Sequence, residues 1–251
     1  GEGEGEGEGE GEGEACSNAW FPVDVEGWTK TFALSGSEGN TGTRTESSTG
    51  LLSSHPESST GEVYGLSIDL QTSAWSYTIV QSIGCDTHGE GVFFHDYAGD
   101  WSIMLYDIFE VTGTVETDLS PSRQLLPPEY AVGATGNWNY SYTSTFVTET
   151  EYGSGSSTVE TSTMSYNGTY TETGFETITL ATGDTVDAYV LTNEFTASGT
   201  PPIGFPIPAA GSIKQWFVKG LGLVRQVTSE DGTDETFTRE LESYSGLTVI
   251  E

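Results

Sequence analysis

The most constraining feature of this chain is an alternation of side chains with a period of two residues. One face of a central segment carries Trp138, Tyr140, Tyr142, Ser144, Phe146 and Thr148, while Asn, Ser, Thr and Val stand between them. A period of two is that of a β-strand, whose successive side chains point to opposite faces. No extended window of the chain shows the 3.6-residue period of an amphipathic helix. The chain is therefore predicted to be all-β.

Turn residues separate the alternating segments. Gly183-Asp184 stands between two such runs and predicts a tight hairpin, and Asn167-Gly168 predicts a type I′ turn. Gly36–Thr60 is rich in Ser, Thr and Gly, so we expect a long exposed loop there. Three further strands are expected near the end, at Lys214–Lys219, Leu221–Thr228 and Glu235–Tyr244. Together these patterns predict roughly a dozen antiparallel strands in a barrel or a strongly curved half-barrel.

The chain divides into a short low-complexity tract and one domain. Residues 1–14 are seven Gly-Glu repeats, which have no apolar side chain to bury and are expected to form a disordered tether. Residues 15–251 form a single domain with two candidate halves, about 15–125 and 126–251. Trp28 and Trp138 follow similar Pro and Gly residues 110 positions apart, so the halves are either duplicated or share a strand opener by chance.

The charge of the chain excludes several partners. Its 38 acidic and seven basic residues give a net charge of −31. Nucleic acid and anionic membrane surfaces are not expected partners, because both attract Lys and Arg and repel carboxylates. No apolar run approaches the length of a membrane-spanning helix. The chain does not begin with Met or a leader, so we expect that any export signal has been removed or was not included.

Residue usage points to an oxidising compartment outside the cytosol. Ser and Thr dominate the polar positions and Lys is scarce, which is typical of an exported protein. Cys16 and Cys85 are the only two cysteines, and in such a compartment we expect them to pair. That bond would close a loop of about 69 residues. It would add roughly 4 kcal/mol of stability in the chain-entropy picture.

Four phrases resemble a broad group of uncharacterised bacterial exported lipoproteins. They are Trp20-Phe21-Pro22-Val23 with Gly27-Trp28; Leu126-Pro127-Pro128 with Val132-Gly133 and Trp138; Gly174–Leu180 followed by Gly183–Ala188; and Trp216–Val224 with Glu240-Leu241 and Tyr244. The resemblance implies an antiparallel half-barrel of the shape of LolA/LppX-type lipoprotein carriers. It also implies a lipidated Cys upstream of a spacer such as the Gly-Glu tract. Thr182 and Val218-Lys219 depart from the usual phrases, and the group has no established activity to carry over.

Clusters that could carry metal or catalytic chemistry are weak. Cys85, His88 and His95 have a spacing that could hold zinc, but a fourth ligand is missing and Cys85 is expected to pair with Cys16. We therefore expect exposed loop histidines. The acidic turn at Asp231–Glu235 and the Asp184/Asp187 pair offer oxygen ligands for calcium, but an ordinary acidic hairpin turn is favoured. No metal, no cofactor and no enzymatic activity are predicted, since no nucleophile elbow, phosphate loop or His-Glu-x-x-His motif is present.

The aromatic residues give the most specific functional hypothesis. Trp28, Trp75, Trp138 and Trp216 lie in predicted strands or next to them, and on a concave face they could line an apolar pocket for lipid. The alternative is that they fill a closed core. The sequence predicts a non-enzymatic exported or cell-envelope protein, tethered at its N-terminus, whose domain binds a lipid or another apolar ligand. The alternative is a surface structural or adhesive subunit that self-assembles.

Overall fold

The chain folds into a closed barrel of antiparallel strands. The computed structural model describes residues 18–250 except 38, 40, 60, 74, 86, 88–89, 106–108, 134–135, 153–155 and 203–206. Within these residues there are twelve strands and two short 3₁₀ turns. The first six strands are β1 (Thr29–Gly36), β2 (Thr41–Leu51), β3 (Glu62–Thr72), β4 (Trp75–Cys85), β5 (Val92–Leu105) and β6 (Phe109–Leu126). The next six are β7 (Asn137–Tyr152), β8 (Ser156–Thr179), β9 (Thr185–Gly199), β10 (Ala210–Val218), β11 (Gly222–Glu230) and β12 (Thr236–Ser245).

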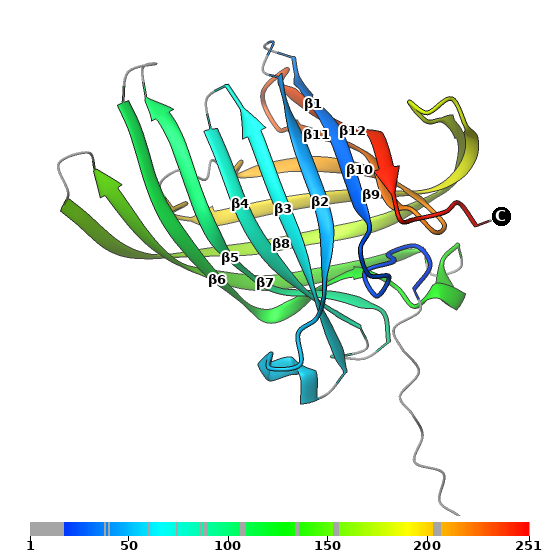
Figure 1. Cartoon of the computed structure of the whole chain (residues 1–251), viewed down its shortest axis with the longest axis horizontal. Coiled ribbons are helices and arrows are strands. Elements are labelled where there is room, and N and C mark those ends of the chain that lie inside the picture. Colours follow the sequence, from blue (N-terminus) through cyan, green and yellow to red (C-terminus); the bar gives the residue numbers. More distant parts are fainter. Residues whose placement is uncertain are drawn as a thin grey trace, which may run out of the picture.

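Every strand pairs with its neighbours along the chain, and β1 pairs with β12 to close the ring. The two short turns, η1 (Pro56–Ser59) and η2 (Glu129–Ala131), lie in the β2–β3 and β6–β7 connections. In Figure 1, β2, β3 and β4 pass in front of β8 and cross it, as expected for two walls of a strongly tilted barrel. The all-β antiparallel prediction is confirmed, and of its two forms the closed barrel is the one observed.

The predicted hairpin at Gly183-Asp184 is confirmed. It joins β8 to β9, and the Leu180 amide donates to the Asp184 carbonyl at 2.8 Å. The three strands expected near the C-terminus are β10, β11 and β12. The proposed boundary between the halves falls at the end of β6, which leaves six strands on each side.

The prediction of a long loop over Gly36–Thr60 is wrong. Strand β2 occupies Thr41–Leu51 and pairs with β1 and β3. Its Thr and Ser residues are typical of a loop in composition, but they alternate with inward side chains such as Arg44 and Glu46. Composition alone therefore misassigned a strand whose outward face is simply hydroxylated.

The predicted type I′ turn at Asn167-Gly168 is also wrong. Strand β8 runs without interruption through this dipeptide, and Gly168 pairs with Tyr140 on β7 and Phe195 on β9. A side chain at Gly168 would collide with the ring of Tyr140 and with the carbonyl of Glu194. The glycine is therefore explained by the close approach of an aromatic ring rather than by a turn.

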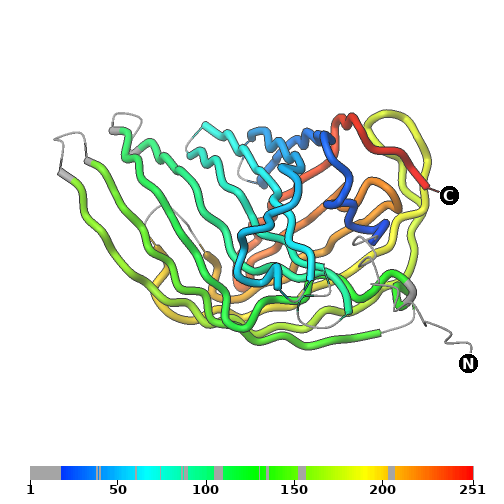
Figure 2. The backbone as a smooth tube through the Cα atoms, turned by 60° about the horizontal axis from the view of Figure 1, so that its bottom comes forward, coloured from blue at the N-terminus to red at the C-terminus, as the bar shows by residue number. Residues whose placement is uncertain are grey.

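Residues 18–28, which precede β1, form a closing segment at one end of the barrel. Val23 is fully buried, and its carbonyl accepts a hydrogen bond from the Ser48 hydroxyl at 2.9 Å. The Trp28 indole donates to the Pro22 carbonyl at 2.9 Å. Figure 2 shows this dark blue segment running beside the first strands of the barrel.

Two predictions lie outside the described residues. The Gly-Glu tract of residues 1–14 and Cys16 belong to the masked part of the chain, so the tether and the Cys16–Cys85 pairing stay predictions. Cys85 itself is buried at the end of β4. No helix in the described part of the chain has the length and apolarity needed to cross a membrane.

Candidate ligand cavity

The interior of the barrel contains a cavity of about 200 Å³. Its walls come from the closing segment and from strands on both sides of the barrel. The apolar lining includes Phe21, Pro22, Val23, Trp28, Leu66, Phe94, Leu125, Tyr170, Ile213, Phe217 and Leu223. The polar lining includes Lys30, Arg44, Glu46, Gln81, Arg123, Gln215, Gln226 and Arg239. The cavity is therefore an apolar space with an unusual number of charged groups.

The charge on this lining is opposite to that of the protein. Four of the seven basic residues in the chain line the cavity, namely Lys30, Arg44, Arg123 and Arg239. Among the described lining residues Glu46 is the single carboxylate. A chain of net charge −31 thus surrounds an interior where cations outnumber carboxylates four to one.

Glu46 lies at the centre of three of these cations. One of its carboxylate oxygens accepts from Arg44 Nε at 2.7 Å and from Arg239 Nη1 at 2.9 Å. Its other oxygen lies 3.5 Å from Lys30 Nζ, which also donates to the carbonyls of Leu221 and Leu223. The strands β2, β1 and β12 that carry these side chains are adjacent in the barrel, so the cluster occupies one wall.

The pKa values follow from burial and from these charges. Burial alone would raise the pKa of Glu46, but Arg44, Arg239 and Lys30 lower it to about 2. Burial lowers the pKa of Lys30 to about 8, because the attraction of Glu46 only partly offsets desolvation and the repulsion of Arg239. Burial likewise lowers the pKa of Arg239 to about 10, with repulsion from Arg44 adding to the effect. One carboxylate is therefore insufficient to neutralise its surroundings.

Arg123 lies on the opposite side of the strand order, on β6. Its guanidinium stands over the rings of Tyr140 at 4.7 Å, Tyr170 at 5.3 Å and Tyr142 at 5.9 Å, and it donates to the Tyr170 hydroxyl. Burial raises the pKa of Tyr142 to about 12, so the phenol is neutral near pH 7. Within the described residues no carboxylate forms an ion pair with Arg123.

Two buried nitrogens of the lining have no hydrogen-bond partner among the described residues. They are Nε of Arg123 and Nε of Arg239. Arg239 is only 7% exposed, so water from outside does not reach its side chain freely. Buried polar groups are normally hydrogen-bonded, and each exception indicates a missing partner or a functional role.

The four predicted tryptophans do not share one surface. Trp28 lines the cavity, with Lys30 Nζ 5.0 Å from its ring centroid. Trp138 is the cross-strand partner of Tyr170 and stacks on its ring at 4.9 Å, so it lies beside the cavity lining without being part of it. Trp75 contacts Tyr77 at the start of β4, and Trp216 donates to the partly exposed Glu176 at 2.8 Å.

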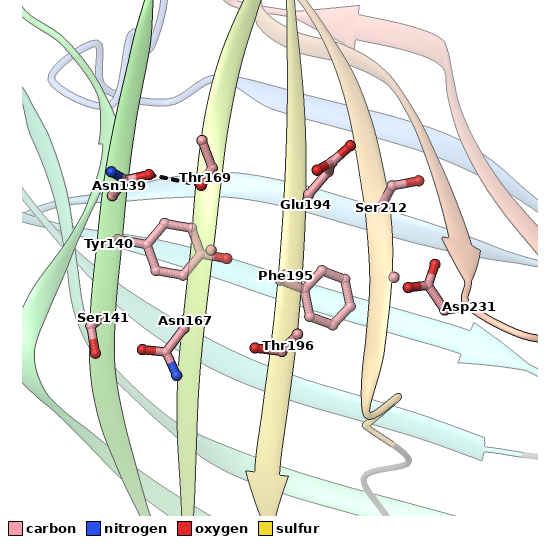
Figure 3. Close-up of a pocket in the computed structure, with 12 residues that line it drawn as sticks. Asn139, Tyr140, Ser141, Asn167, Thr169, Glu194, Phe195, Thr196, Ser212 and Asp231 are labelled. Carbon is pink, nitrogen blue, oxygen red and sulfur yellow. Dashed lines mark hydrogen bonds between the residues drawn. The ribbon is translucent and has the colours of Figure 1, made fainter.

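A second, larger hollow of about 950 Å³ lies on the outside of the barrel, over β7, β8, β9 and β10 (Figure 3). Tyr140 packs against Arg123 in the interior, so its neighbours Asn139 and Ser141 point outward. The only hydrogen bond drawn there joins Thr169 Oγ1 to Asn139 Oδ1 at 2.7 Å. None of its described lining residues carries a buried polar atom without a partner. This hollow therefore lacks the unsatisfied donors of the interior cavity.

The histidines do not form a metal centre within the described residues. His88 lies outside them, and no group of three or more potential ligands occurs in the remainder. His95 was expected in an exposed loop, which is wrong: it is 2% exposed on β5, with Nδ1 2.7 Å from the Ser122 hydroxyl. Asp187 accepts from Thr177 at 2.7 Å, as a carboxylate in an ordinary hairpin does.

Sequence reasoning missed the cavity's charged residues. Arg44 and Glu46 fell in the segment assigned to a loop, and Lys30, Arg123 and Arg239 were not singled out. A usable signal was present. The chain has only seven basic residues, and Lys30, Arg44, Arg123 and Arg239 each occupy a position in an alternating strand pattern. Inward basic residues on several strands are unusual enough to indicate a site.

Comparison with known proteins leaves function open. No family model and no curated protein sequence matches the chain. A candidate exported protein with a YmcC-like fold from Bacteroides fragilis aligns with TM-score 0.49 and 11% identity over 90% of this chain and 98% of its own. The hypothetical lipoprotein YmcC from Escherichia coli aligns with TM-score 0.38 and 11% identity, over 91% of this chain and 89% of its own. A candidate lipoprotein from Parabacteroides distasonis aligns with TM-score 0.39 and 10% identity, over 92% of this chain and 100% of its own.

These neighbours are exported or lipoprotein-type chains by their descriptions, but such scores carry no argument for this protein. The half-barrel of LolA/LppX-type carriers, which the sequence resemblance implied, is not the observed form, because β1 pairs with β12 and closes the barrel.

Proposed function

We propose that this protein is a non-enzymatic, exported binding module whose barrel holds a small anion with an apolar part. The observation that supports it is the excess of buried cations around the cavity. Lys30 and Arg239 are 4% and 7% exposed, and they share a single carboxylate with Arg44. A bound anion would supply the negative charge that this wall lacks.

The energetic argument is one of desolvation. Removing an ion from water costs several kcal/mol per charge, and only a well-placed opposite charge offsets this cost. Four cations with one carboxylate leave three positive charges without an opposite charge in the cavity. A group of charges that destabilises the ligand-free fold is what a binding site for an oppositely charged ligand requires.

The size of the cavity narrows the ligand class. An apolar cavity of ~150 Å³ admits a molecule such as benzene. The present cavity of about 200 Å³ is only slightly larger, so its ligand is a small aromatic or short-chain acid. A complete membrane lipid does not fit inside, although the acidic end of one would have the same chemistry. This refines the lipid hypothesis that the tryptophans suggested.

The alternative of self-assembly has less support. Every strand in the described barrel has two neighbours, and β1 pairs with β12, so the sheet has no free edge. Free edges are the usual route by which β proteins add further strands from other copies. An adhesive or structural role would need a side-chain interface instead.

The remaining parts of the proposal concern location and chemistry. The acidic tract before the domain suits a tether that holds the barrel away from a surface, and the scarcity of Lys suits an exported protein. Glu46 is held ionised by its cations, so it is a poor proton carrier near neutral pH.

Calorimetric titration tests the proposal with two pairs of isosteric probes. Benzoate and hexanoate should bind saturably with one site per chain, whereas benzamide and hexanamide should bind at least about tenfold more weakly. Arg239→Gln should weaken benzoate binding by about tenfold or more. The matched control is Arg225→Gln, which removes a partly exposed arginine paired with Glu240 at 3.0 Å and should leave affinity unchanged.

Two results would contradict the proposal. Equal affinity for the acids and the amides would show that charge plays no part. Absence of binding by every probe, in protein shown to be folded, would remove the cavity as a site for small anions.

A further inference from the structure

The cavity has two separate places for acidic groups, and they face each other across the barrel. The first is the wall of β1, β2 and β12, where Arg239 has an unpartnered buried Nε beside the Glu46 cluster. The second is on β6, where Arg123 has the same feature among tyrosine rings. In the closed strand order β6 and β12 are six positions apart in a ring of twelve, which is the largest separation this barrel offers.

Both places line one continuous cavity, and most of the lining between them is apolar, with Gln81, Gln215 and Gln226 as its uncharged polar side chains. Leu66, Phe94 and Leu125 belong to its walls on the β3, β5 and β6 side, and Phe217 and Leu223 belong to the β10 and β11 side. A ligand that reached from Arg239 to Arg123 would therefore cross hydrocarbon and aromatic surface between two cationic ends.

From this arrangement we infer that the ligand carries two acidic groups joined by a short apolar spacer, one group at Arg239 and the other at Arg123. The inference rests on the proposed function and specifies its ligand. A single acid would give a partner to the Nε of one arginine and leave the Nε of the other without one, whereas a diacid gives a partner to both. Phosphonates and sulfonates share this chemistry with carboxylates, and so does a free inorganic dianion, which lacks the spacer.

Titrations of matched acids test the inference in the unmodified protein. The probes are succinate, adipate and suberate, each compared with the monoacid of the same length: butyrate, hexanoate and octanoate. One diacid of the series should bind at least about tenfold more tightly than its monoacid, and the advantage should depend on length. Sulfate and phosphate serve as the inorganic dianions.

A variant assigns the second acid to Arg123. Arg123→Gln should remove the advantage of the diacid over the monoacid and leave monoacid affinity within about threefold. Arg239→Gln should weaken both. Because a change at a buried arginine can unfold the barrel, circular dichroism and the melting temperature of each variant are measured first. Tyr170→Phe, which removes one hydrogen bond to Arg123, gives a milder second variant and should reduce the diacid advantage without abolishing it.

Each outcome decides a different statement. Equal binding of diacids and monoacids overturns the two-acid inference but leaves the anion cavity standing. Tighter binding of sulfate or phosphate than of any diacid also overturns it, since the site would then take an inorganic dianion at one end. Absence of binding by all acids overturns the proposed function itself.

Discussion

Replacing Glu46 by Gln tests whether the charge cluster is energetically coupled as its geometry indicates. Gln has the same shape and its oxygen can still accept from Arg44 and Arg239, so the substitution removes the negative charge and the acceptor that faces Lys30 Nζ. In the folded protein the pKa of Glu46 is lowered to about 2 from an ordinary 4.5. One pKa unit corresponds to ~1.4 kcal/mol, so the ionised carboxylate stabilises the fold by about 3 kcal/mol at neutral pH.

The measurement is the free energy of unfolding of wild type and Glu46→Gln by urea denaturation between pH 2 and pH 7. We expect a loss of about 3 kcal/mol at pH 7, which is a fall in melting temperature of roughly 6–12 °C for a domain of this size. A carboxylate with a lowered folded pKa contributes its stability above its unfolded pKa and loses it as pH falls through the folded one. The difference between the two proteins should therefore shrink from about pH 4.5 and be largely gone near pH 2.

Glu240→Gln is the matched control, because it removes a carboxylate that is paired with one arginine at 3.0 Å but is 43% exposed. Exposed pairs of this kind contribute about 0–1 kcal/mol. If Glu46→Gln cost no more than Glu240→Gln at pH 7, the buried cluster would not be coupled, and the reasoning from cation excess to anion binding would fail.

Three further predictions follow from single features. Burial lowers the pKa of Lys30 to about 8 from 10.5, so the free energy of unfolding of wild type, relative to that of Lys30→Met, should rise by about 3 kcal/mol as pH increases from about 7 to 10.5. A difference that stays constant over this pH range in urea unfolding would contradict this prediction. Gly168→Ala should cost about 1–3 kcal/mol in chemical denaturation, because the added methyl collides with Tyr140, and an unchanged midpoint would mean that the ring moves freely. Added NaCl should raise the melting temperature through screening of a −31 charge, and a salt-independent value would show that the carboxylates are too dispersed to repel.

The strands were predictable because their signal is local. Alternation at Trp138–Thr148 and the Gly183-Asp184 turn each depend on neighbouring residues, and both gave the correct element. Asn167-Gly168 failed because its cause is not local: the ring that requires the glycine belongs to Tyr140 on another strand. Closure of the barrel is of the same kind, since the pairing of β1 with β12 joins the two ends of the domain.

The site was harder to predict than the fold, because it depends on which strand faces which. Lys30 and Glu46 are cross-strand partners in consecutive strands, but Arg239 lies 193 residues after Glu46, and only the pairing of β1 with β12 brings it to 2.9 Å from the carboxylate. The size of the tryptophan side chains indicated a pocket for an apolar ligand, yet of the four candidates only Trp28 lines the described cavity. The scarcity of basic residues was the better signal, but it acquires meaning only when their inward direction is known.

The distribution of basic residues connects the charge of the whole chain to the cavity. The three that do not line it are each paired outside: Lys214 with Glu176 at 2.7 Å, Lys219 with Glu129 at 3.3 Å and Arg225 with Glu240 at 3.0 Å. The outer surface therefore has no described unpaired lysine or arginine, while the interior has cations in excess. An acidic exterior alone would be explained by solubility, and scattered buried arginines alone would be explained by accident. The proposed function accounts for both features together, because cations retained against their desolvation cost in a chain that has so few of them are expected where an anion binds.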